Sequence, residues 1–489
     1  MSTTRAFASV ARLCIRSVAQ ARPYSSSPAA LRAAPLSATS PPDFHNPPHP
    51  PFPDDVPTHP LIIIDYERIR AWDAAEVDQL WKAATTIGFW YLKNHGTDAE
   101  VDRVFAMGDA FMRLPLEEKM KYEQGDEGNS FGYKYAGANA TNAAGARDTI
   151  EFLNIAQDHV PLDTTSHHTS PSTSRPFPST SPPFPSTPSP SHHTPFHTHH
   201  TSFHTHYPPP VSLPLVTSFI RHSREINLTL MRALGERLGL GAAIGVRNSV
   251  GVLEAGRPVG VLEAQNAVDV LEAQNAVDAL DARPTTDVLS ALHAADLPSG
   301  SELRFTKNAI PTDPEEALRK GIGAHTDFGS LSLVHNRLGG LQVLVPDSQE
   351  WQYVKPLPAH AVCNIGDALA ILSGGILRSN LHRVVPPPPP QRHLARTSLV
   401  FFTRPNRDVV LRALVGESRQ IAEAVEGRRE KGEDVEPYLG TQTAGEWFAR
   451  RIRGWRIRNR EGPQTWIASR GTEGRSEEEI PDEGMAQRR

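Results

Sequence analysis

The sequence predicts a mainly β fold with flanking helices: a double-stranded β-helix, or jelly-roll barrel, with an N-terminal α/β region. Two observations lead to this prediction. Residues 285–410 contain several short runs of alternating apolar and polar residues separated by turn-forming residues, as in a double-sheet jelly roll. Residues 61–161 instead mix β-rich runs with segments of helical periodicity.

Several segments of this 489-residue chain have compositions unsuited to a folded core. Residues 41–60 form a Pro-rich linker, and residues 162–216 are a low-complexity insertion of Ser, Thr, Pro and His that we expect to be disordered. Residues 241–284 carry a nine-residue repeat in which Val261–Asp269 and Val270–Asp278 are identical. Because a few short copies cannot bury a core of their own, we interpret this stretch as a second insertion.

The remaining segments predict individual strands and helices. Apolar spacing and β-rich runs favour strands at Leu61–Asp65 and Trp90–Leu92 and helices at Ala74–Thr86, Glu100–Arg113 and Thr217–Leu240. Residues 217–240 would thus add one helix to the N-terminal and barrel regions.

Residues 411–489 are expected to form C-terminal helices and a disordered tail. Thr443 and Glu446 form a capping box that predicts the start of a helix. Six arginines between Arg450 and Arg460 form a local basic run. We interpret that run as a solvated helix face and expect no nucleic-acid partner, because the formal net charge of the chain is −5.

Targeting and redox signals are sparse. Residues 1–40 contain arginines but no acidic residue, the composition of a mitochondrial transit peptide; without import, the protein would be cytoplasmic. No apolar run is long enough to span a membrane, so we expect no membrane partner. The two cysteines, Cys14 and Cys363, exclude a disulfide framework, and Cys363 is expected to be a small buried side chain.

His325, Asp327 and His382 are the candidate metal ligands. Two imidazoles and one carboxylate form the ligand set of non-haem Fe(II) oxygenases, which leaves one side of the metal open. Residues i and i+2 of a strand share a face, so His325 and Asp327 are expected to project together from one strand end. His95 follows a predicted strand and precedes Gly96, and we interpret it as structural.

Arg396 and Ser398 have the same i, i+2 spacing within the β-rich run 394–402. Arginine binds carboxylates through two parallel hydrogen bonds and stays charged when buried, so this pair is suited to hold a carboxylate co-substrate. Together with the ligand pattern, the pair indicates an enzyme that uses iron and a 2-oxo acid to oxidise a small molecule.

These residues resemble the 2-oxoglutarate and Fe(II)-dependent dioxygenases of the isopenicillin N synthase-like group. The likeness covers residues 60–160, 217–240 and 285–410. It extends to the motifs at Gly88–Gly96, Leu114–Lys119, Gly340–Leu344, Asn364–Ala368 and Ser379–Val384.

The resemblance implies a ligand set and a reaction. It implies that His325, Asp327 and His382 bind iron and that Arg396 and Ser398 hold the distal carboxylate of 2-oxoglutarate. It further implies hydroxylation, desaturation or cyclisation of a small molecule by O2, with release of succinate and CO2 and with ascorbate as an optional reductant.

The chain departs from the family's pattern at one place. Many plant members have a co-substrate-binding Tyr where this chain reads Leu303–Pro311, which contains none. Isopenicillin N synthase uses no oxo acid, and its Arg-x-Ser pair holds the substrate. An Fe(II) oxidase without oxo acid therefore stays open, as does a non-catalytic jelly-roll protein inactivated by its insertions.

The substrate and the oligomeric state are not encoded in any motif that we recognise. Lys307, Phe328, Phe402 and Arg404 are candidates for lining the pocket, with core packing the favoured role for the two aromatic side chains.

Overall fold

The computed structural model describes residues 49–160, 207–241, 287–310 and 322–471. The expected transit peptide at residues 1–40 and most of the segments predicted as insertions and tail lie outside the described residues. None of the described helices combines the length and apolar character needed to cross a bilayer.

The described strands pair into two sheets, as a double-sheet jelly roll requires. The large sheet has the order β1-β2-β10-β7-β12-β5-β4-β3, and the small sheet has the order β6-β11-β8-β9. The strands of the large sheet are β1 Ile63–Asp65, β2 Phe89–Lys93, β3 Gly132–Lys134, β4 Ile150–Ala156, β5 Glu302–Asn308, β7 Leu331–Asn336, β10 His360–Ile365 and β12 Arg396–Thr403. Those of the small sheet are β6 Ile322–His325, β8 Leu341–Leu344, β9 Trp351–Tyr353 and β11 His382–Val384.

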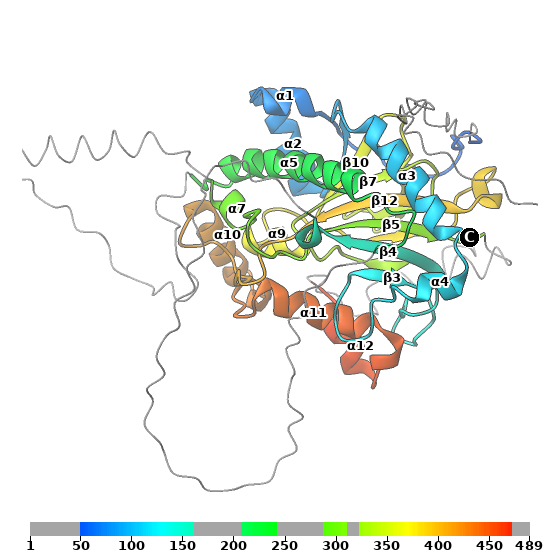
Figure 1. Ribbon diagram of the computed structural model, residues 1–489. Coiled ribbons are helices and arrows are strands. Elements are labelled where there is room, and N and C mark those ends of the chain that lie inside the picture. The colour runs from blue at the N-terminus through cyan, green and yellow to red at the C-terminus, as the bar shows by residue number, and fades with distance from the viewer. Residues whose placement is uncertain (1–48, 161–206, 242–286, 311–321, 472–489) are drawn as a thin grey trace, which may run out of the picture. The chain divides into compact units, whose positions relative to one another are not determined.

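Helices cover the outer face of the large sheet, where α5 lies across β5, β7 and β12 and packs against α2 and α3 (Figure 1). The N-terminal and central helices are α1 Tyr66–Arg70, α2 Ala74–Thr86, α3 Asp98–Met112, α4 Leu116–Met120, α5 Leu213–Arg237, α7 Val288–Ala291 and α9 Asp367–Leu372. The C-terminal helices are α10 Arg419–Glu430, α11 Ala444–Trp455 and α12 Pro463–Ser469.

Alternation along the strands separates two cores. On β2, Trp90 and Leu92 join the large core beneath the helices, whereas Phe89 and Tyr91 join a smaller core that includes Val343 of β8. Successive strand residues point to opposite faces, so one run of sequence supplies both cores. One face of the large sheet is covered by the helices, and the other is turned toward the small sheet. Polar side chains that form a site can therefore lie on this second face.

The predicted elements agree with the structure at most positions. The helix predicted at Ala74–Thr86 has these bounds, and the capping box of Thr443 and Glu446 forms at the start of α11. Cys363 is fully buried, and burial raises the pKa of its thiol. His95 is buried with Nδ1 2.9 Å from the hydroxyl of Thr97, which fits its structural interpretation.

One boundary differs from the prediction. Helix α5 begins at Leu213, within the segment expected to be a disordered insertion, because Leu215 and Val216 are buried in the large core and Pro214 suits the first turn. The strands of the N-terminal region belong to the large sheet, in which β1 and β2 lie at one edge and β3 and β4 at the other.

The prediction for the C-terminal arginines is wrong at two positions. Arg451 and Arg456 are among the most buried side chains, with 0% and 1% exposure, whereas Arg453 and Arg458 are exposed. Arg451 pairs with Asp367, and Arg456 pairs with two carboxylates of the loop after α4. Burial is tolerated because each guanidinium meets an acidic partner from a distant segment.

Candidate metal centre

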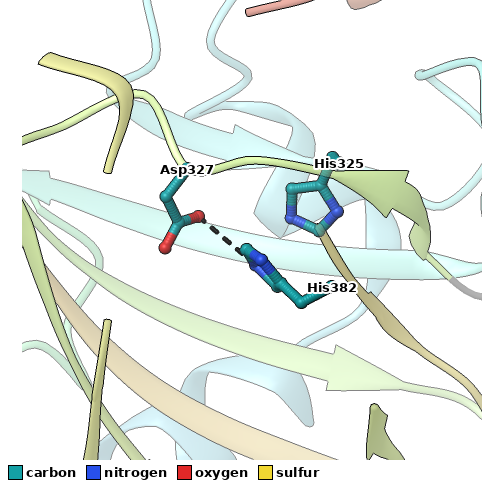
Figure 2. A group of neighbouring side chains, drawn as sticks. All are labelled: His325, Asp327 and His382. Atoms are coloured by element: carbon teal, nitrogen blue, oxygen red, sulfur yellow. Dashed lines mark ion pairs between the residues drawn. The ribbon is translucent and has the colours of Figure 1, made fainter. Parts of the chain in front are cut away.

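Three side chains that offer metal ligands converge beside the small sheet (Figure 2). His325 is the last residue of β6 and His382 is the first residue of β11, and the two are direct partners in antiparallel pairing. Directly opposed residues share a face, so the two imidazoles lie together. One ligand atom from each of His325, Asp327 and His382 lies within 4.8 Å of the others.

Asp327 reaches this point differently from the expectation. It lies beyond the end of β6 rather than within the strand. The turn that carries it is held by a backbone hydrogen bond of 2.8 Å, in which the N–H of Asp367 donates to the carbonyl of Asp327. The start of α9, rather than strand alternation alone, therefore fixes the backbone position of this carboxylate.

Backbone carbonyls orient both imidazoles. Nδ1 of His325 lies 2.8 Å from the carbonyl oxygen of Gly323, and Nδ1 of His382 lies 3.1 Å from that of Asn380. A carbonyl only accepts, so each Nδ1 carries a proton and donates it. In the neutral ring this tautomer leaves Nε2 as the free nitrogen, which is the arrangement a metal ligand needs.

The two oxygens of Asp327 have different surroundings. Oδ2 accepts hydrogen bonds from the hydroxyl of Ser332 at 2.5 Å and from the amide nitrogen of Asn364 at 2.7 Å. Oδ1 lies 3.7 Å from Nε2 of His382. The carboxylate is thus held through one oxygen while the other faces the histidines.

Burial and charge set the protonation of His325 and Asp327. Burial, together with the nearby charge of His382, lowers the pKa of His325 to about 3. Burial by itself would raise the pKa of Asp327, but the nearby positive charge of His382 outweighs it and holds that pKa well below its usual range. The carboxylate is therefore ionised and favours positive charge between the three side chains.

A cavity extends from these side chains between the two sheets, and Arg396 and Ser398 of β12 line it. Arg396 donates from Nη1 to the hydroxyl of Ser398 at 2.7 Å and from Nε to the carbonyl of Gly339 at 2.9 Å. Burial lowers the pKa of Arg396 to about 10, so it remains charged at neutral pH. No described carboxylate forms an ion pair with this buried cation.

A second cationic group lines the same cavity. Arg304 and Arg404 each donate from Nη2 to one oxygen of the buried Glu302, at 2.9 Å in both cases. Arg304 also lies over the ring of Phe402, 4.8 Å from its centroid. Two guanidinium groups share one carboxylate, so this wall carries excess positive charge.

The C-terminal helix α11 closes against the turn between His325 and Asp327. The hydroxyl of Thr326 donates to the carboxylate of Asp367 at 2.8 Å, and Arg451 of α11 pairs with the same carboxylate. The ring of Trp455, at the end of α11, lies 5.7 Å from that of His325. The C-terminal segment thus contributes both a support and a wall to the site.

The five site residues predicted from sequence line one cavity: His325, Asp327, His382, Arg396 and Ser398. Of the further pocket candidates, Phe328, Phe402 and Arg404 line it as well. Lys307 does not, because it lies on the opposite face of β5, 3.9 Å from Glu151.

Sequence reasoning missed other cavity residues. Arg304, Thr306 and Asn308 alternate along β5, and that alternation was the signal that could have assigned them to one face. Trp455 had no local signal, since only the packing of α11 brings it to the cavity.

Two family models match the chain. The model of the 2OG-Fe(II) oxygenase superfamily matches residues 301–405, and that of the non-haem dioxygenase in morphine synthesis N-terminal region matches residues 61–176. The first range contains the five predicted site residues, and the second contains the N-terminal strands of the large sheet.

Curated relatives match the same regions. A 2-oxoglutarate-dependent dioxygenase of Amanita muscaria is 41% identical over 115 residues, covering 23% of this chain and 54% of that protein. Homoarginine-6-hydroxylase of Oryza sativa is 27% identical over 360 residues, covering 72% of this chain and 85% of that protein. The chain matches between 32% and 54% of the length of the first three curated relatives.

Among solved structures, a full-length protein of Neurospora crassa, crystallised in complex with alpha-KG and thymine, has a similar fold. The alignment covers 80% of this chain and 96% of that chain, with 18% sequence identity and a TM-score of 0.51. At this identity the likeness concerns the arrangement of the two sheets and their helices.

Proposed function

This chain belongs to the 2OG-Fe(II) oxygenase superfamily, and we propose on that premise that it is a dioxygenase dependent on Fe(II) and 2-oxoglutarate. In the simplest case a C–H bond of a small molecule becomes C–OH. O2 then supplies one oxygen atom to that product and one to succinate, while 2-oxoglutarate loses CO2. Desaturation and ring closure on the same site are the other outcomes of this chemistry.

We propose His325, Asp327 and His382 as the iron ligands. Their donor set is the one that leaves positions open for other ligands, and their buried ligand atoms lie within 4.8 Å of one another. When bound, the iron supplies oxidation by O2 coupled to breakdown of the oxo acid. The chain holds each histidine in a fixed orientation through the carbonyls of Gly323 and Asn380.

The observation that carries the proposal is the isolated charge of Arg396. A guanidinium that is only 4% exposed, without a carboxylate partner among the described residues, is costly unless a ligand neutralises it. It lines the same cavity as the candidate ligands, as does Ser398. A 2-oxo acid with a remote carboxylate would chelate the metal with its oxo-acid end and neutralise Arg396 with its remote carboxylate.

Other residues of the same cavity are suited to contact a substrate. Phe328, Phe402 and Trp455 give it apolar walls, and Arg304 gives it a polar one. A small molecule bound there would lie next to the candidate iron ligands.

The proposal is tested by anaerobic titration of the full chain with Fe(II) and then with 2-oxoglutarate. A chelated oxo acid gives a visible charge-transfer band. We expect the band in the wild-type protein, its loss in His382→Ala, and a shift to roughly tenfold higher 2-oxoglutarate concentration or more in Arg396→Ala, because a charge-assisted hydrogen bond is removed.

The other outcomes support the alternatives. Iron binding without a band favours an Fe(II) oxidase that uses no oxo acid, in which Arg396 would hold the substrate itself. A folded wild-type protein that binds no iron favours a non-catalytic jelly-roll protein and contradicts the proposal.

A further inference from the structure

Strand β5 carries two polar side chains toward the cavity. Asn308 pairs directly with Arg396 across the β5–β12 ladder, and Thr306 pairs directly with Ser398. Opposed residues of an antiparallel pair project from the same face of the sheet. All four side chains accordingly line the same cavity, in two adjacent cross-strand pairs.

Thr306 extends the hydrogen bonding of the Arg-x-Ser pair. Its Oγ1 lies 3.0 Å from Oγ of Ser398, which also accepts a hydrogen bond of 2.7 Å from Arg396. Thr306 is 8% exposed, so few water molecules can compete for this contact. The hydroxyl of Ser398 is therefore held from two sides and has a defined orientation.

Asn308 directs a donor into the cavity. Its Oδ1 accepts a hydrogen bond of 3.0 Å from the hydroxyl of Thr149, which assigns Oδ1 to that side and Nδ2 to the other. Asn308 is 7% exposed and lines the cavity, and its Nδ2 donates to no described residue. A carboxamide nitrogen offers two N–H groups, so Nδ2 can donate to a ligand in the cavity.

We propose that Asn308 donates a hydrogen bond to the remote carboxylate of the bound oxo acid, beside Arg396 and Ser398, and that Thr306 positions Ser398 for the same contact. This inference rests on the proposed function, since it assumes that an oxo acid occupies the cavity. An ionised carboxylate has about four acceptor sites, so the Arg-x-Ser pair leaves room for a third donor.

The test measures binding of 2-oxoglutarate to the Fe(II)-loaded full chain under anaerobic conditions, from the visible charge-transfer band. We expect Asn308→Ala to raise the dissociation constant by roughly 10- to 100-fold, as for hydrogen bonds to charged groups. Thr306→Val should raise it by roughly 2- to 10-fold, because it acts through Ser398. Lys307→Ala is the matched control, since Lys307 lies between the two on the opposite face of β5.

Asn308→Asp keeps the shape of the side chain and replaces the donor by an acid. It should weaken binding more than Asn308→Ala, because two carboxylates would then face each other. Because this variant does not truncate the side chain, its weaker binding would not result from a cavity in the fold. Thermal unfolding of the variant and of the wild type shows whether the fold is retained.

A second oxo acid separates ligand contact from general support of the site. 2-Oxovalerate has the five-carbon chain of 2-oxoglutarate but no remote carboxylate. If Asn308 contacts that carboxylate, Asn308→Ala should bind 2-oxovalerate as the wild type does. An equal loss for both oxo acids, or an unchanged affinity for 2-oxoglutarate, overturns the inference while leaving the proposed function intact. No band in the wild-type protein contradicts the proposed function, and this inference with it.

Discussion

Single residues behind the candidate ligands determine how those ligands lie. Asn364 donates to Asp327, and Gly366 two residues later allows the chain to pass close to the ligand turn. A Cβ at Gly366 would lie 2.1 Å from the carbonyl oxygen of Gly329. The motif at residues 364–368 therefore has a physical reason: one residue holds the carboxylate, and the next but one must lack a side chain.

Histidines away from the site make the protein sensitive to acid. Burial, with a smaller contribution from the charge of His95, lowers the pKa of His335 from 6.5 to about 3, and burial lowers that of His293 to about 4. The unfolded chain takes up these protons below pH 6.5, whereas the folded chain resists them. The contribution of these neutral histidines to the free energy of unfolding is thus fully present above pH 6.5, and it is lost as the pH falls toward the folded-state pKa.

We predict that His335→Leu makes the free energy of unfolding less dependent on pH. A pKa difference of one unit corresponds to about 1.4 kcal/mol. When the pH falls from about 7.5 to about 5, the free energy of unfolding of the variant should therefore decrease by about 2 kcal/mol less than that of the wild type. Urea denaturation at the two pH values measures this gain. His393→Leu, at an exposed position, controls for the loss of one histidine. The same pH dependence in His335→Leu and the wild type would refute the prediction.

Among the elements, α11 has the strongest influence on the site. It begins at a complete capping box and delivers Arg451 to Asp367, which in turn accepts the hydroxyl of Thr326. Arg451 also lies over the ring of Phe328, 3.7 Å from its centroid. One buried guanidinium thus connects the C-terminal helix to the turn between two candidate ligands.

We predict that Arg451→Met lowers the free energy of unfolding by about 3–5 kcal/mol, because it leaves Asp367 buried without its cationic partner. Arg453→Met is the matched control on the same helix, since Arg453 is exposed, and should change stability by less than about 0.5 kcal/mol. Urea denaturation provides both values. The double variant Arg451→Met/Asp367→Asn should lose less than the sum of the single losses, whereas additive losses would argue against direct coupling.

For the whole molecule, the large sheet joins distant parts of the chain. Strands β1 and β2 lie at one edge and β3 and β4 at the other, with the strands of residues 302–403 between them. The N-terminal region is therefore part of the same sheet as the site. The chain leaves the described part after Val160 and returns at Tyr207, where the hydroxyl of Tyr207 lies 3.3 Å from Nδ1 of His159.

We predict that residues 162–205 can be replaced by a short Gly/Ser linker without loss of Fe(II) and 2-oxoglutarate binding. The flanking residues already lie close together, and a shorter loop lowers the entropy of the unfolded chain. The free energy of unfolding should rise by about 1–2 kcal/mol. Anaerobic titration and urea denaturation of the shortened chain check both parts. Loss of binding in a folded variant would show that this segment contributes to the site.

Local patterns in the sequence were sufficient for the candidate ligands and for several elements. The spacing of His325 and Asp327 and the i, i+2 relation of Arg396 and Ser398 identified residues that do share one cavity. Helix Ala74–Thr86 was predicted with its observed bounds. These features depend on neighbours a few residues apart, because side-chain direction repeats about every two residues in a strand and about every 3.6 in a helix.

The tertiary structure decided what those patterns could not. Arg451 pairs with Asp367 because of the way α11 packs. The sequence could not predict this pairing, because several neighbours of Arg451 in the sequence are also arginines. The pairing of Asn308 with Arg396 depends on the register between two strands separated by most of the jelly roll. Both are contacts between residues far apart in sequence, where the energy of burial and pairing, rather than local periodicity, determines the outcome.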